Sequence, residues 1–546
     1  MARVHQKMST GLPGLDEVLK GLKLGDNVVW QTDTVEEYAQ FVRPFCQKAV
    51  RQSRRLIYFR FGSHEPLLTE EDGVEIVELD PAEGLEQFIA RVHGVIEDVG
   101  RGAYYVFDCL SDLLTYWYSD HMLGSFFMLT CPYLYDLETV TYFCLLRNQH
   151  SSHATQPILR TTQLWVDVFR HQGDIYIRPI KVQHRYSPTM EMVHVWDEEE
   201  FRPVSASVII SQIQTRAWAG LESDVLVGSW ERSFMEAQSA LEAVEEGEMD
   251  SAVADKMFRE LARMLLSRDE GMLRLVDNYL TLRDVLDVYG RMIGTGLIGG
   301  KTVGMLLARA IIRERAPEIF ESLEPHDSFY IGSDVFYTFL VRNGVWWLRQ
   351  KQRDPETFLD DAALARQRIL AGVFPDYLLQ RFEKMLAYFG QSPIVVRSSS
   401  LLEDNFGNSF AGKYESVFCA NQGPREQRLE DFLAAVRTIY ASTMSEEALR
   451  YRERRGLLES DEQMALLVMR VSGARHGHYY YPHAAGVGFS FNPYAWSPKI
   501  DPEAGVTRVV FGLGTRAVDR SDDDYTRVVA LNAPNRRPEA NFDEVR

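Results

Sequence analysis

The chain has 546 residues, of which 45% are hydrophobic, 12% aromatic and 25% charged. This composition excludes a disordered, collagen-like or disulfide-knot protein, and the length predicts about three to four domains. With 59 Lys and Arg against 78 Asp and Glu, the net charge is −19, which argues against nucleic acid or an anionic membrane as a main partner. Local basic pockets for a nucleotide remain compatible with this charge.

Cysteine usage and hydropathy predict where the protein resides. The cysteines are odd in number, and none has the C-x-x-C spacing, which favours a reducing compartment. The N-terminus has no apolar signal segment, and acidic residues interrupt the most apolar stretch, 104–146. We therefore expect no membrane-spanning segment, and a soluble, cytoplasmic protein.

Residues 1–200 alternate between short β-rich runs and helical patterns. Helices are predicted at 36–52 and 84–99. Strands are predicted at 27–30, 56–61, 74–79, 103–108, 139–146 and 174–182. Strands that alternate with helices are typical of a parallel α/β domain.

The alternation of predicted strands and helices ends after this region. The acidic run 197–200, followed by Pro203, is interpreted as a solvated linker at a domain edge. Residues 201–290 are predicted to form a linker and helical connector, because 230–290 has helical spacing of Ala, Leu and Met. Residues 291–546 then show an α+β pattern. It comprises a Gly-rich turn at 294–304, a helix at 305–316 and strands at 393–399, 464–471, 484–493 and 507–514.

The segment STGLPGLD (9–16), followed by Gly25 and a strand, resembles the opening of RecA-like ATPases of the circadian-clock (KaiC) type. A phosphate loop needs glycines and a lysine, but residues 31–38 contain neither and carry three acidic residues. We therefore expect a degenerate RecA-like domain that has lost ATP hydrolysis and serves as an interaction or assembly module. Asp108 resembles the Walker B aspartate and is interpreted as a relic or a helix-capping carboxylate, not a metal ligand.

HSSHA (150–154) resembles a phosphohistidine motif, but it precedes the last predicted strands of the first domain. It is therefore interpreted as a loop with exposed histidines. His150 and His153 alone do not make a zinc ligand set.

GGKTVG (299–304) is not a Walker A motif, because Thr295 stands where that motif needs glycine. Gly-Gly-Lys before an apolar helix instead resembles the start of the nucleotide-binding domain of pyruvate phosphate dikinase and phosphoenolpyruvate synthase. The motifs of that family recur in order within 396–415: Val-Arg-Ser-Ser (396–399), Glu403-Asp404, Ser-Phe-Ala-Gly (409–412) and Glu415. The resemblance covers roughly 295–530, with departures at 302–303, 469 and 515.

The resemblance implies an ATP-grasp-type domain over 291–546, incomplete at its C-terminal end, in which Lys301 and Arg397 hold phosphates as the catalytic residues. It assigns cofactor binding to the following residues: Lys301, Arg397, Glu403, Asp404, Ser409, Phe410, Ala411, Gly412, Met469 and Val471. Met469 and Val471 would meet the adenine through their backbone. Three alternatives to these roles stay open. In the first, Arg397 is a structural arginine paired with Glu403 or Asp404. In the second, Lys301 is a surface lysine, and in the third, the carboxylates of Glu403 and Asp404 only orient Arg397.

The resemblance also implies ATP and Mg²⁺ as cofactors, although no metal ligands can be identified, because the family's metal-binding glutamate and Gln-x-Arg segment have no counterpart in 517–546. The chain is interpreted as the front part of a longer protein with phosphohistidine and phosphoenolpyruvate/pyruvate domains. The expected function is that of a kinase-type phosphotransferase passing phosphate from ATP to a carrier histidine absent from this chain. The alternative is a non-catalytic nucleotide-sensing or scaffold protein. RecA-like domains often form rings, so a homo-oligomer is also considered.

Overall fold

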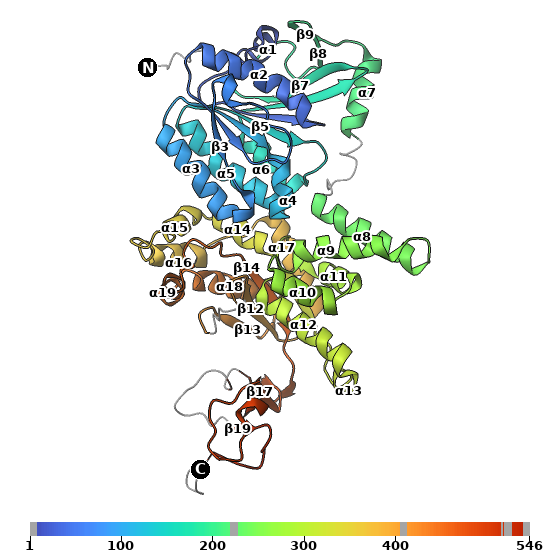
Figure 1. Ribbon diagram of the computed structural model, residues 1–546, viewed down its shortest axis with the longest axis vertical. Helices are drawn as coiled ribbons and strands as arrows, with labels where there is room; N and C mark the ends of the chain where they lie inside the picture. Colours follow the sequence, from blue (N-terminus) through green and yellow to red (C-terminus); the bar gives the residue numbers. More distant parts are fainter. Residues whose placement is uncertain (1–7, 219–227, 404–411, 515–516, 518–526, 539–546) are drawn as a thin grey trace.

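The computed structural model describes residues 8–218, 228–403, 412–514, 517 and 527–538. Figure 1 shows three parts that follow one another along the chain. An N-terminal α/β unit comes first, then a central unit of helices around a second sheet, and then a small β lobe near the C-terminus. The fold is thus mixed α/β, with a large sheet that contains a parallel core.

The N-terminal sheet has the strand order β3-β2-β4-β5-β1-β6-β7-β8-β9. Its strands are β1 (Asn27–Thr32), β2 (Leu56–Arg60), β3 (Glu75–Glu78), β4 (Tyr104–Cys109), β5 (Val140–Leu146), β6 (Leu164–His171), β7 (Asp174–Val182), β8 (His194–Asp197) and β9 (Glu200–Pro203). Pairing is parallel from β3 to β6 and antiparallel beyond β6. The predicted strands are therefore confirmed, and they pair in parallel except for 174–182 (β7), which is antiparallel to both of its neighbours. The acidic run 197–200 was wrongly interpreted as a linker. It closes the β8–β9 hairpin, where Asp197 pairs with Glu200 and Glu198 takes a positive φ of 53°.

Helices cover both faces of this sheet because its strands are apolar on both sides. Trp30 and Val28 face one core, with Phe41 of α2, whereas Val29 faces the other, with Phe126 of α5. The helices of this unit are α1 (Pro13–Leu19), α2 (Val35–Arg51), α3 (Leu85–Val99), α4 (Leu114–Trp117), α5 (Asp120–Asp136), α6 (Ser152–Thr161) and α7 (Ser207–Trp218). The predicted helices at 36–52 and 84–99 correspond to α2 and α3.

The central unit begins with the predicted helices of the connector. They are α8 (Ser229–Glu245), α9 (Ser251–Leu265), α10 (Glu270–Tyr279) and α11 (Leu282–Tyr289). The second sheet follows, in the order β10-β11-β14-β12-β13. Its strands are β10 (Met292–Ile293), β11 (Ser328–Ile331), β12 (Ile394–Ser400), β13 (Ser416–Cys419) and β14 (Met464–Arg470).

Helices also cover both faces of the second sheet. Helix α12 packs with the connector on one face, and α14, α17 and α18 pack on the other. The helices of this part are α12 (Gly300–Arg315), α13 (Pro317–Phe320), α14 (Ser333–Arg342), α15 (Trp346–Lys351), α16 (Ala362–Leu370), α17 (Asp376–Phe389), α18 (Arg425–Ser442) and α19 (Glu446–Arg455).

The N-terminal and central units share a continuous hydrophobic core, in which Trp117 and Phe126 belong to the same buried cluster as Phe336. Charged groups reinforce this contact. The fully buried Glu86 of α3 accepts a hydrogen bond from Arg353 at 3.1 Å and lies 3.3 Å from Arg349. The two units are therefore held together by apolar packing and by a buried carboxylate.

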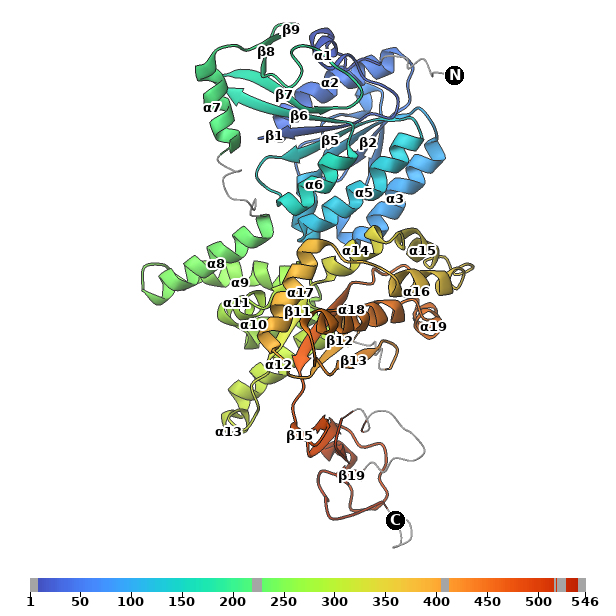
Figure 2. The same ribbon diagram turned by 180° about the vertical axis from the view of Figure 1, so that it is seen from behind.

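The small β lobe is joined to the central unit by a single extended connection (Figure 2). Its strands are β15 (Ala474–His476), β16 (Tyr479–Tyr481), β17 (Ala484–Phe489), β18 (Val506–Phe511) and β19 (Arg527–Ala530). Among the described helices, none has both the length and the apolar character needed to cross a membrane. The cysteines, Cys46, Cys109, Cys131, Cys144 and Cys419, are all free and buried.

Candidate functional site

The first turn of α12 lies directly against the end of β12 because two glycines make room for it. A Cβ on Gly299 would stand 1.4 Å from the carbonyl oxygen of Ser399, and one on Gly300 would stand 2.1 Å from that of Glu403. Gly299 also has a φ of +81°, a conformation that favours glycine. The Gly-Gly-Lys motif is therefore a close-packing motif that brings Lys301 to this strand.

Lys301 is fixed at this junction by polar contacts. Its ammonium lies 2.7 Å from Glu403 Oε1 and donates to Ser398 Oγ at 2.9 Å. The Glu403 side chain is 2% exposed, whereas that of Lys301 is 21% exposed. Glu403 also accepts from the Ser398 hydroxyl and from the Ser400 amide, each at 3.0 Å. Both oxygens of Glu403 are thus engaged, and its charge is balanced by Lys301.

Ser399 closes the start of the helix. Its hydroxyl oxygen accepts from the Thr302 amide at 3.1 Å, and the hydroxyl donates to the Ile298 carbonyl at 2.8 Å. The α12 N-terminus therefore already has a neutral hydrogen-bond partner for one of its amides. Sequence reasoning named no role for these serines, although they stand in the Val-Arg-Ser-Ser run that carried the resemblance.

Arg397 lies on β12 with an exposed side chain. It is directly opposite Leu467 of β14, which packs in the core on the α12 side of the sheet. Directly opposite residues in an antiparallel pair point to the same face, so Arg397 emerges on the face that α12 covers. Among the described residues, its guanidinium has no hydrogen-bond or ion-pair partner. The expected alternative of an Arg397–Glu403 pair is wrong, because Glu403 faces Lys301.

The predicted adenine-side residues lie on and after β14. Met469 is half-buried and pairs in the sheet with Ser328 and Val395. The Val471 amide donates to the Pro393 carbonyl at 2.9 Å, and its carbonyl accepts from the Tyr480 hydroxyl at 3.2 Å. An adenine nitrogen that accepted from the Val471 amide would have to replace Pro393, whereas the Val471 carbonyl has a second lone pair for an adenine amino group.

The remaining predicted residues belong to the segment that follows Glu403. Asp404, Ser409, Phe410 and Ala411 lie outside the described residues. A Cβ on Gly412 would meet nothing within 4 Å. Two residues further on, the hydroxyl of the buried Tyr414 donates to Glu462 at 2.5 Å.

The N-terminal unit has a closed surface where a phosphate loop would stand. Only two residues separate β1 from α2, and the carboxylate of Glu37 accepts the Asp33 amide at 3.0 Å. A negative charge thus already occupies the helix N-terminus, where a phosphate would bind. The carboxylate of Asp108 is likewise engaged by several hydrogen-bond donors. It accepts from Arg60 at 2.6 Å and from the amides of Phe61 and Gly62 at 2.8 and 2.7 Å. Asp108 therefore fixes the loop that follows β2 and caps no helix among the described residues, so the expected helix-capping role is wrong.

The histidines of 150–154 differ from the expected exposed loop. His150 is buried and lies 2.7 Å from the Ser111 hydroxyl, and burial lowers its pKa to about 4. Ser151 caps α6, in which His153 stacks on Tyr377 at 4.6 Å. The expectation is confirmed for the exposure of His153 and wrong for His150, which tertiary packing buries, and 152–154 form the start of α6 where a loop was expected. Across the described part of the chain, no group of three or more His, Cys, Asp or Glu side chains could hold a metal ion.

The comparisons with known proteins bear on the central unit and the small lobe. None of the curated proteins compared with the chain matches it. Residues 295–545 match the family model described as "Pyruvate phosphate dikinase, AMP/ATP-binding domain". The match includes Lys301 and Arg397, and it supports an ATP-binding domain of the pyruvate phosphate dikinase and phosphoenolpyruvate synthase type in this part of the chain.

Proposed function

We propose that the central unit and the small β lobe bind ATP between them in the manner of an ATP-grasp domain. The protein would thereby supply the ATP-binding part of a kinase-type phosphotransferase that passes phosphate to a carrier histidine on another domain. The observation that carries this proposal is Arg397. Within the segment that matches the ATP-binding family, it is an exposed arginine without a partner among the described residues, on the face of the sheet that α12 covers.

The proposed chemistry is positioning and charge neutralisation. The planar guanidinium of Arg397 can donate two parallel hydrogen bonds to phosphate oxygens. Lys301, oriented by Glu403 and partly exposed, adds a point charge beside it. Residues 409–412 are the proposed cover over the phosphates, and at the last of them, Gly412, a Cβ would meet nothing within 4 Å. Phosphoryl transfer depends chiefly on such fixed charges.

We also propose that Mg²⁺ accompanies ATP, as it does in phosphoryl transfer generally. Glu403 does not fit a metal ligand, because both of its oxygens are engaged by Lys301, Ser398 and Ser400. Glu403 is therefore not proposed as a ligand of Mg²⁺.

Calorimetry of ATP binding to the full chain tests the proposal, with and without Mg²⁺. We expect ATP to bind and Arg397→Ala to weaken binding by at least about tenfold, as loss of a charge-assisted contact predicts. Arg259→Ala, which removes an exposed arginine from α9, is the matched control and should bind as the unchanged protein does. Equal affinity of both variants would place the nucleotide elsewhere and contradict the proposal.

The second candidate function is a nucleotide sensor or scaffold without turnover. It is favoured by the engaged oxygens of Glu403 and by the Glu37 carboxylate at the α2 N-terminus. The two candidates differ in the fate of ATP. The test supplies a phosphohistidine domain of the same family as the phosphate acceptor. Production of AMP or ADP in its presence, lost in Arg397→Ala, supports the phosphotransferase, whereas ATP that binds and is recovered intact in its presence supports the sensor.

For the N-terminal unit we propose a degenerate RecA-like domain that serves in assembly, including assembly into a homo-oligomer. The central parallel strand β1, followed at once by a helix, supports this assignment, because the same strand-loop-helix order carries the phosphate loop in P-loop proteins. A cytoplasmic location is proposed on the five free cysteines.

A further inference from the structure

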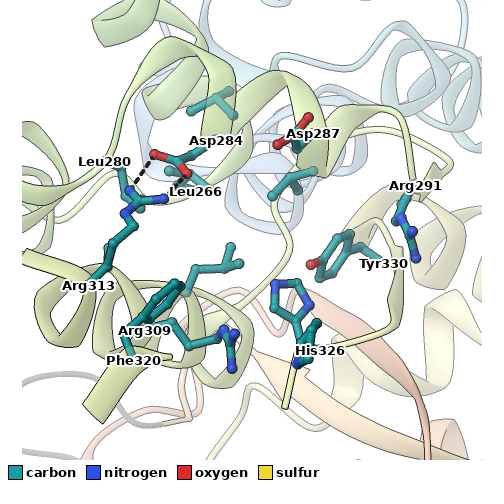
Figure 3. A pocket seen from close by; sticks show the side chains of 15 residues that line it. Leu266, Leu280, Asp284, Asp287, Arg291, Arg309, Arg313, Phe320, His326 and Tyr330 are labelled. Atoms are coloured by element: carbon teal, nitrogen blue, oxygen red, sulfur yellow. Dashed lines mark hydrogen bonds and ion pairs between the residues drawn. The ribbon is translucent and has the colours of Figure 1, made fainter. Parts of the chain in front are cut away.

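A cavity of about 490 Å³ lies on the central unit between α11, α12, α13 and β11 (Figure 3). It is separate from the candidate nucleotide site along α12. Lys301 stands in the first turn of that helix, whereas Arg309 and Arg313, which line the cavity, stand near its other end. At 1.5 Å per residue, Lys301 and Arg309 are about 12 Å apart along the helix axis.

Two polar side chains face this cavity without partners. Tyr330 is 1% exposed, and Figure 3 shows its hydroxyl directed into the cavity. In the described part of the chain, nothing forms a hydrogen bond with this hydroxyl. Nδ1 of His326 is buried without a partner. Because buried polar groups are normally hydrogen-bonded, this nitrogen points to a ligand that provides the missing bond, and the Tyr330 hydroxyl is free to form a second one.

The wall around His326 is cationic. Burial and the charges of Arg309 and Arg291 lower the pKa of His326. Arg291 donates to Asp327 at 2.6 Å, and Arg313 is paired with Asp284 at 2.9 Å. Arg309 instead donates to the carbonyl of Glu324 at 3.0 Å and lies over the ring of Phe320. It has no carboxylate partner among the described residues, so its positive charge is available to a ligand.

The rest of the lining is largely apolar. Leu266, Leu280, Val285 and Leu306 line the cavity and are part of, or pack against, the hydrophobic core that joins the connector to α12. Asp284 and Asp287 line the wall formed by α11, across the cavity from Arg309 in Figure 3. Their charges disfavour a ligand with acid groups at both ends.

We propose that this cavity is a second ligand site, which takes a small organic acid with an apolar body and a single carboxylate or phosphate group. The acid group lies against Arg309, where the Tyr330 hydroxyl and the His326 ring can complete its hydrogen bonds. The apolar body lies against the leucines of the connector. A volume of about 490 Å³ is within the range of ligand pockets, which is roughly 300–1,000 Å³.

A pair of dyes that differ in one charge tests this proposal on the full chain. 1-Anilinonaphthalene-8-sulfonate has an aromatic body and one sulfonate, and N-phenyl-1-naphthylamine is the same body without the sulfonate. Fluorescence titration should show one saturable site that binds the sulfonate dye more tightly. Equal affinity for both dyes would show that the cavity does not select an anion and would overturn the proposal.

Substitutions assign the dye to the cavity. Arg309→Met, which keeps an apolar side chain beside Phe320, should weaken sulfonate-dye binding by about tenfold and leave the neutral dye unaffected. Arg315→Met is the matched control, because Arg315 is an exposed arginine of the same helix outside the cavity lining. Tyr330→Phe, which removes only the hydroxyl, should also weaken binding. Unchanged affinity in both Arg309→Met and Tyr330→Phe would overturn the proposal.

Competition separates this site from the nucleotide site and identifies the acid group. Excess ATP should leave the dye bound, and displacement of the dye by ATP would overturn the assignment. 3-Phenylpropanoate and phenyl phosphate should be tested as competitors. Displacement by either supports the site and the stronger competitor identifies the preferred acid, whereas displacement by neither would overturn the proposal.

Discussion

The ammonium of Lys301 lies 2.7 Å from the carboxylate of Glu403, and this ion pair joins the first turn of α12 to the turn that follows β12. Glu403 therefore orients the lysine of the candidate site, not its arginine. The two residues therefore have different roles. The exposed Arg397 is free to bind a ligand, whereas Lys301 is held in place by Glu403.

Replacement of Glu403 by glutamine should destabilise the central unit. The substitution removes the charge that balances Lys301 and weakens the acceptor for Ser398 and Ser400, so we expect a loss of about 1–3 kcal/mol. Urea unfolding measures this loss. The control is Glu415→Gln, since Glu415 is exposed, and it should change stability by less than about 0.5 kcal/mol. Equal stabilities of the two variants would show that the ion pair does not stabilise the fold.

Two glycines of α12 should respond in opposite directions to alanine. Gly300→Ala places a Cβ 2.1 Å from the Glu403 carbonyl and should cost about 1–3 kcal/mol through overpacking. It should also weaken ATP binding, because it displaces Lys301. Gly304 has nothing within 4 Å of a Cβ, so Gly304→Ala should stabilise the helix by about 0.5–1 kcal/mol. Thermal unfolding and ATP titration of both variants check this, and a neutral Gly300→Ala would contradict the close-packing role.

The contact between the N-terminal and central units should depend on Glu86. Its buried carboxylate accepts from Arg353 and from the Glu462 amide, and it lies near Arg349. Glu86→Gln leaves Asp461, 3.6 Å from Arg353, as the remaining carboxylate beside the two buried arginines, and should cost up to about 3–5 kcal/mol. Limited proteolysis and urea unfolding would report earlier separation of the two units.

The matched control for this prediction is Glu83→Gln. Glu83 pairs with Arg91 at 3.4 Å on the surface, with both side chains more than 40% exposed. A pair of this kind contributes about 0–1 kcal/mol. If Glu86→Gln were no more destabilising than Glu83→Gln, the buried network would not hold the interface.

The interface should also weaken at alkaline pH through His121. Burial opposes its charge, but Asp334 at 2.9 Å and the nearby Asp120 outweigh this effect and raise the pKa of His121 to about 9. The folded pKa is above the unfolded value of about 6.5, so this stabilisation is complete below about pH 6.5 and is lost as the pH rises through about 9.

The measurement is the melting temperature at pH 6.5 and at pH 9.5. The unchanged protein should lose up to about 3 kcal/mol of stability between these values through His121, and His121→Gln should lose correspondingly less. Glu231, His153 and Tyr377 also surround this histidine, so the comparison is made between the two proteins at each pH. An identical pH dependence of both would exclude His121 as the titrating group.

Local patterns were sufficient to predict the buried parallel strands of the N-terminal sheet. The apolar runs of β1, β2, β4 and β5 reflect strands buried on both faces, and this burial is a property of the run itself. The missing glycines and lysine after β1 likewise excluded a phosphate loop, because a loop that binds phosphate needs those residue types wherever it stands. The Val-Arg-Ser-Ser segment and the Gly-Gly-Lys segment were recognised differently, by their resemblance to motifs of the pyruvate phosphate dikinase and phosphoenolpyruvate synthase family.

Partner choice was decided by the tertiary structure. Lys301 and Glu403 are 102 residues apart in the chain, and Arg397 was an equally reasonable partner for that carboxylate from sequence. His150 was expected on the surface because its polarity says nothing about the packing that buries it against Ser111. The cavity beside Arg309 depends on four elements that only the folded chain brings together. The periodicity of the sequence determined which side of each element is buried. The identity of the residues in each contact depends on long-range packing, so only the tertiary structure determined it.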